Sequence, residues 1–119
     1  PAEIHGLLQP QLAFQDREIF CIVILDARSQ VLGVNTVSIG SVSASIVHPR
    51  EVFRPAILMG ASSIILGHCH PSGDPSPSKD DIELTRRLLK AGEILGIEVL
   101  DHIIIANSQF LSFKEKGLI

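Results

Sequence analysis

The 119-residue sequence contains no tryptophan, no tyrosine and only two cysteines, Cys21 and Cys69. Two thiols so far apart, with no CxxC pair, exclude both a disulfide framework and a four-thiolate zinc site. Because the only large aromatic residues are five phenylalanines, the core is expected to be aliphatic. The sparing use of cysteine favours a reducing, cytoplasmic location.

Positive charge is also scarce. Ten lysines and arginines stand against thirteen aspartates and glutamates, which gives a formal net charge of −3. Proteins that grip nucleic-acid phosphates need clustered Lys and Arg, so direct nucleic-acid binding by this domain is not expected. Apolar runs such as 20–25 are too short to cross a bilayer, so no membrane partner is expected either.

Hydrophobic residues make up 45% of the chain, which is enough for a real core, and the length fits a single domain over residues 1–119. A chain of this size can fold without a structural metal ion or a disulfide bond, so any bound metal is expected to have a catalytic rather than a structural role. The sequence carries no signal for an oligomeric state.

The hydrophobic pattern alternates between strand and helix signals and predicts an α/β fold. Strands are expected at 18–25 and 30–39 as a hairpin, at 44–47, at 62–67 as a doubly buried central strand, at 97–100 with 102–106, and at 110–113. Helices are expected at 3–14 with a break near Pro10, at 50–61 with a kink at Pro55, and at 78–95 with Gly96 as the C-cap. Residues 68–77, rich in Pro, Gly and Ser, are expected to form a loop after the central strand.

His68 and His70 lie where this central strand ends. Side chains at i and i+2 of a strand point to the same side, so the two imidazoles should lie side by side. Such a pair is a chelating arrangement for a metal ion, whereas the simpler alternative is a pair of loop histidines without a ligand. His102 is expected to be a sheet histidine held by a hydrogen bond, and His48 a turn or cap residue.

Asp81 lies in the first turn of the helix expected at 78–95. Its carboxylate is expected to point inward, because it heads an apolar stripe made of Leu84, Leu88, Ala91 and Leu95. Two imidazoles and one carboxylate would supply the three protein ligands that are typical of a catalytic zinc site. Ser78 and Asp81 also fit an N-terminal capping box, and this alternative stays open.

The spacing His68-x-His70, seven residues, Ser78, two residues, Asp81 resembles the HxH-x7-S-x2-D signature of the JAB/MPN+ (JAMM) metalloprotease superfamily. The segments HPSGDPSPS, GIEVLDHIII and SFKEKGLI look like parts of the C-terminal domain of bacterial RadC-type DNA repair proteins. This likeness runs from about residue 11 to the end of the chain. It implies the α/β JAB/MPN fold, a cytidine-deaminase-like mixed β-sheet flanked by helices.

The resemblance also implies roles for individual residues. His68, His70 and Asp81 match the zinc ligands of the superfamily. Ser78 matches the serine that steadies the oxyanion of the tetrahedral intermediate. Glu18 matches the glutamate that serves as general base from an early strand.

Two details of the resemblance are less constrained. Glu51 is a fallback for the base, because no fixed spacing ties Glu18 to the histidine loop. Between the two histidines lies Cys69, where RadC-type chains commonly carry Asn. Its thiol should face away from both imidazoles, although it could act as a soft competing ligand or as an oxidation site.

The implied function is that of a zinc-dependent metallohydrolase, a JAMM-type metallopeptidase that cleaves an unidentified peptide-like or isopeptide bond. The alternative from a different class is a non-catalytic interaction module of a DNA repair accessory protein, which the retained metal-site residues disfavour. A zinc deaminase of the same general architecture would need an H-x-E and a P-C-x-x-C motif, and the sequence has neither.

Overall fold

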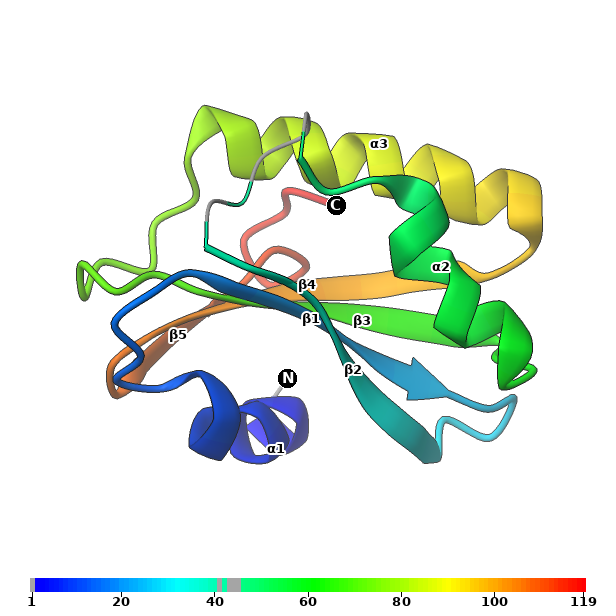
Figure 1. Ribbon diagram of the computed structural model, residues 1–119, viewed down its shortest axis with the longest axis horizontal. Coiled ribbons are helices and arrows are strands. Elements are labelled where there is room, and N and C mark those ends of the chain that lie inside the picture. Colours follow the sequence, from blue (N-terminus) through cyan, green and yellow to red (C-terminus); the bar gives the residue numbers. More distant parts are fainter. Residues whose placement is uncertain (1, 41, 43–45) are drawn as a thin grey trace.

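The computed structural model describes residues 2–40, 42 and 46–119. In chain order it contains α1 (Ala2–Leu12), β1 (Ile19–Leu25), β2 (Val31–Ile39), α2 (Pro49–Leu58), β3 (Ser63–Cys69), α3 (Lys79–Leu95), β4 (Glu98–Ala106) and β5 (Gln109–Ser112). Figure 1 shows the sheet between two helical layers, with α2 and α3 on one face and α1 on the other. The predicted mixed sheet flanked by helices is confirmed. No helix among the described residues has the length and apolar character needed to span a membrane.

The five strands are ordered β2-β1-β3-β4-β5, so β3 lies in the middle. β1 is antiparallel to both of its neighbours, β3 is parallel to β4, and β4 is antiparallel to β5. A parallel pair needs a crossover connection, which α3 supplies between β3 and β4. One loop, residues 70–78, therefore joins the end of the central strand directly to the N-terminus of α3.

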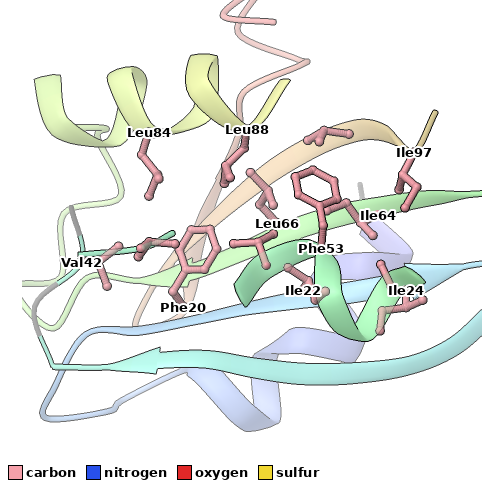
Figure 2. Packing of buried hydrophobic residues seen from close by; sticks show 14 residues of the cluster. Phe20, Ile22, Ile24, Val42, Phe53, Ile64, Leu66, Leu84, Leu88 and Ile97 are labelled. Atoms are coloured by element: carbon pink, nitrogen blue, oxygen red, sulfur yellow. The ribbon is translucent and has the colours of Figure 1, made fainter. Parts of the chain in front are cut away.

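The core has two parts because side chains alternate along the central strands. One cluster lies under α2 and α3 and includes Phe20, Phe53 and Leu88, which Figure 2 shows packed together with their neighbours. A second cluster lies under α1 and includes Leu8 and Cys21. All seven residues of β3 are buried, as expected for a strand that is covered on both faces.

Two helices differ from their predicted bounds. α1 ends at Leu12 rather than at residue 14, and it runs through Pro10 without a break. Pro10 removes only one helical hydrogen bond close to the end, and buried Leu12 anchors that last turn. α2 ends at Leu58 rather than at residue 61, because Met59 forms the C-cap and Gly60 turns the chain with a φ of 67°.

The strands differ as well. His68 and Cys69 belong to β3 rather than to the loop, because both pair with β4 in parallel register. The strand expected at 44–47 is not confirmed: residues 44 and 45 lie outside the described residues, and residues 46 and 47 form a turn and a bend. β4 begins at Glu98 rather than at residue 97 and includes Asp101.

The buried stripe of α3 differs from the prediction at its C-terminal end. Gly92 is buried, whereas Leu95 is 47% exposed. A Cβ atom on Gly92 would lie only 2.4 Å from the Ile97 carbonyl oxygen. The Gly92 carbonyl also accepts hydrogen bonds from the Gly96 and Ile97 amides, so the chain turns back tightly against the helix.

Gly92→Ala is expected to destabilise the protein by about 1–3 kcal/mol, because the new methyl group would overlap the backbone of residue 97. Gly6→Ala is the matched control: Gly6 lies in α1 with no heavy atom within 4 Å of a Cβ there, and alanine should stabilise the helix by roughly 0.5–1 kcal/mol. Chemical denaturation measures both changes. Equal stability of the two variants would contradict the close approach of α3 and Ile97.

Candidate metal centre

His68 is fully buried at the C-terminal end of β3 and lies between two carboxylates. Its Nε2 is 3.3 Å from Glu18 Oε1, and its Nδ1 is 3.5 Å from Asp81 Oδ1. Neither ring nitrogen has a hydrogen-bond partner among the described residues. Burial lowers the pKa of this imidazole, although the Asp81 charge opposes the change, and so favours the neutral form that binds metals.

His70 follows in the loop, with its ring perpendicular to that of His68 and the ring centres 4.7 Å apart. The prediction that the two imidazoles lie side by side is confirmed. Nδ1 of His70 lies 2.9 Å from the Asp74 carbonyl oxygen, which can only accept, so this nitrogen carries the proton. Nε2 lies 3.0 Å from Asp81 Oδ2, and in a neutral ring both of these atoms are acceptors. A proton or a cation must therefore lie between them.

Asp81 both caps α3 and points toward the histidines, the two roles that the sequence left open. Ser78 Oγ accepts a hydrogen bond from the Asp81 amide at 3.1 Å, and Asp81 Oδ2 accepts one from the Ser78 amide at 2.9 Å, which completes a capping box. The carboxylate is also only 2% exposed and points inward at both histidines, as predicted. Burial by itself raises the pKa of Asp81, but hydrogen bonds from His70 and the Ser78 amide lower it to about 2, so the group is ionised.

Glu18 directly precedes β1 and brings a second carboxylate to His68. Its Oε2 accepts a hydrogen bond from the Val42 amide at 3.3 Å, while Oε1 faces the imidazole. The side chain is 35% exposed, so it contacts both His68 and solvent. The structure does not bring the fallback residue Glu51 into this group, because it lies in the first turn of α2 and lines a hollow beside Leu58.

Three of these residues form a group that could hold a metal ion. One ligand atom each from Glu18, His68 and His70 lies within 4.8 Å of the other two. The ligand set predicted from the sequence contains Asp81 in place of Glu18. Asp81 lies 3.0 Å from Nε2 of His70, but at His68 it faces Nδ1, whereas Glu18 faces Nε2. The buried, unpartnered nitrogens of His68 fit a metal in either case. The two candidate ligand sets thus share both histidines and differ in the carboxylate.

The chain is similar to known proteins over nearly its full length. Residues 1–118 match a family model described as the RadC-like JAB domain. The chain belongs to this family. Similar curated proteins are the UPF0758 proteins of Moorella thermoacetica and Desulforamulus reducens, 53% and 54% identical over 119 residues, and that of Methanosarcina acetivorans, 47% identical over the same length. Each match covers all of this chain but 52% of the relative, so the chain spans about half the length of these curated relatives.

A further buried histidine, His102 of β4, lies beside the candidate metal ligands of this RadC-like JAB domain. Its Nδ1 lies 2.7 Å from Thr85 Oγ1, and the Thr85 hydroxyl donates to the Asp81 carbonyl at 2.7 Å. Because that hydroxyl has a single proton, it must accept from His102 Nδ1. Burial lowers the pKa of His102 to about 3, so the ring stays neutral and ties β4 to the first turn of α3. The predicted hydrogen-bonded sheet histidine is confirmed.

Two residues of the site were not singled out by the sequence. Thr85 carried a usable signal, because it is a polar residue on the buried stripe of α3. Val42 carried none, because it contributes a backbone amide, which every residue except proline possesses. Side-chain chemistry alone could not have identified it.

Ser78→Ala is expected to lower the free energy of unfolding of this RadC-like JAB domain by about 1 kcal/mol, since it removes the acceptor for the Asp81 amide at the N-cap of α3. Ser78→Thr keeps a hydroxyl at the cap and should recover most of that stability. Urea denaturation followed by circular dichroism measures both variants. If they unfold at the same urea concentration, the cap does not stabilise the helix.

Proposed function

We propose that this domain is a zinc-dependent hydrolase that cleaves a peptide-like or isopeptide bond. The observation that supports this function is the buried imidazole of His68: both of its ring nitrogens lack a hydrogen-bond partner among the described residues, and the half-buried imidazole of His70 lies beside it. Polar groups of this kind are costly to bury unless a partner joins them. When bound there, zinc supplies a Lewis acid that polarises a carbonyl group and lowers the pKa of a water molecule.

In this proposal His68, His70 and Asp81 hold the metal. The Asp81 carboxylate is shielded from water and lies within 3.5 Å of a nitrogen of each histidine, which suits a permanent ligand. Hydrogen bonds orient two of the three groups: the Ser78 amide bonds to Asp81, and the Asp74 carbonyl bonds to His70. These three side chains would hold the metal and leave it accessible to water or substrate.

Glu18 then serves as the general base and, later, as the general acid. Its carboxylate is partly exposed and can exchange protons with solvent, and its Oε1 lies 3.3 Å from Nε2 of His68. It takes a proton from the attacking water and returns one to the leaving nitrogen. Ser78 uses its Oγ lone pair for the Asp81 amide, which leaves the hydroxyl proton to donate to the substrate oxyanion.

We also propose that residues 1–119 form one domain that works in the cytoplasm, where its two free cysteines stay reduced. The resemblance to the JAMM metalloproteases favours a peptide-like substrate. The excess of acidic over basic residues disfavours direct binding of nucleic acid.

Protein purified without chelators is expected to contain about one zinc per chain by elemental analysis. His68→Ala and Asp81→Asn should reduce the content to near zero, because each removes a ligand. Glu18→Gln should keep the metal. Asp80→Asn is the matched control, since Asp80 is an exposed acid in the same helical turn, and it should also keep the metal.

The metal content of the two carboxylate variants decides between the two candidate ligand sets. If Glu18→Gln loses the metal and Asp81→Asn keeps it, the ligand set is Glu18, His68 and His70, and Asp81 serves as a helix cap alone. If the parent protein does not take up zinc even when zinc is supplied, the hydrolase proposal fails, and the non-catalytic interaction module becomes the better account.

Glu18→Gln is expected to lower kcat on a panel of peptide and isopeptide substrates by a factor of roughly 10² to 10⁴, because the amide cannot accept the proton. Glu51→Gln should leave kcat unchanged, since Glu51 lies outside the histidine group. Steady-state hydrolysis by zinc-loaded protein measures both. Unchanged turnover in Glu18→Gln would remove Glu18 from the mechanism.

A further inference from the structure

The thiol of Cys69 makes two hydrogen bonds to the backbone on either side of Glu18. The Ile19 amide donates to Cys69 Sγ at 3.2 Å, and the Cys69 thiol donates to the Arg17 carbonyl at 3.3 Å. A thiol has one proton to give and lone pairs to accept with, so a single side chain can form both bonds. We call this pair of bonds the thiol clamp.

The thiol clamp lies where β1 loses its pairing with β3. The ladder between these strands begins at the pair of Phe20 with His68, so Ile19 and Glu18 lie beyond its last pair. On the β2 side, the Glu18 carbonyl is held by the Gly40 amide at 2.8 Å. The thiol clamp supplies the corresponding attachment on the β3 side.

Cys69 and His68 are adjacent in β3 and therefore face opposite sides of the sheet. His68 faces the Glu18 carboxylate, while Cys69 is buried in the cluster under α1. The thiol is only 2% exposed and lies away from both imidazoles, as predicted, so the structure does not support the earlier options of a competing ligand or an accessible oxidation site. Its hydrogen bonds point instead to a role in holding the backbone.

We propose that Cys69 is a positioning residue for Glu18, which it holds opposite His68 through the thiol clamp on residues 17 and 19. The effect on hydrolysis rests on the function proposed above, whereas the effect on the backbone does not. Two amides report on the clamp without any turnover. The Ile19 amide bonds directly to the thiol, and the Val42 amide bonds to the Glu18 carboxylate.

The experiment measures amide exchange and chemical shifts by NMR in the 119-residue chain. Cys69→Ala should speed exchange of the Ile19 amide by roughly fivefold or more, the loss expected for one net hydrogen bond. It should also move the Val42 amide resonance towards its position in Glu18→Gln. Cys69→Ser keeps a donor and an acceptor at this position and should restore both signals.

Cys21→Ala is the matched control. Cys21 is a second buried thiol in the same cluster, and its side chain makes no hydrogen bond to the other described residues. This variant should leave the Ile19 and Val42 amides unchanged. If Cys69→Ala does not fold, the isosteric pair Cys69→Thr and Cys69→Val tests the same point, since only threonine can replace the hydrogen bonds.

In zinc-loaded protein, Cys69→Ala should retain the metal and lose hydrolytic rate, and Cys69→Ser should recover the rate. The proposal is overturned if Cys69→Ala leaves the Ile19 and Val42 amides unchanged, or if Cys21→Ala alters them equally. The outcome for the proposed function is separate, because a protein that never hydrolyses a peptide bond would still give a clear result for both amides.

Discussion

The structure depends on a fully buried histidine at the end of the central strand. A buried imidazole whose two nitrogens lack hydrogen bonds is unfavourable unless charged groups or a metal satisfy it. Here each nitrogen of His68 faces a carboxylate from a different element, Glu18 before β1 and Asp81 in α3. The antiparallel neighbour and the crossover helix of the central strand therefore both contribute to one small group of polar atoms.

The contacts that hold α3 on the sheet also orient the candidate ligands. Asp81 caps the helix through Oδ2, which also faces His70, and it presents Oδ1 to His68, so one oxygen atom of the carboxylate is not used by the cap. Thr85 and His102 then connect the same helical turn to β4. The same contacts stabilise the fold and orient the candidate ligands, so a substitution at one of these residues is expected to change both the free energy of unfolding and the metal content.

Much of the candidate site could be predicted from local sequence. The i and i+2 spacing of His68 and His70 correctly placed two imidazoles side by side, and the helical period correctly turned Asp81 inward. Other features depended on packing. The composition of 68–77 suggested a loop throughout, yet pairing with β4 keeps the first two residues in β3. The helical periodicity of α3 predicted that Leu95 is buried, but this side chain is exposed. The chain turns back against the helix at Ile97, and at the contact point only a residue without a Cβ atom, Gly92, fits.

The sequence by itself determined the elements and the chemistry: an α/β pattern, two histidines at strand spacing, and an acid in the first turn of the strongest helix. These follow from periodicity and helix capping, which act over a few neighbouring residues. Only the tertiary structure decided that Glu18 lies against His68, fifty residues further along the chain. It also decided that the Cys69 thiol forms hydrogen bonds to the backbone on either side of Glu18. Both contacts depend on the register between β1 and β3, which is set by the packing of the whole sheet rather than by any local pattern.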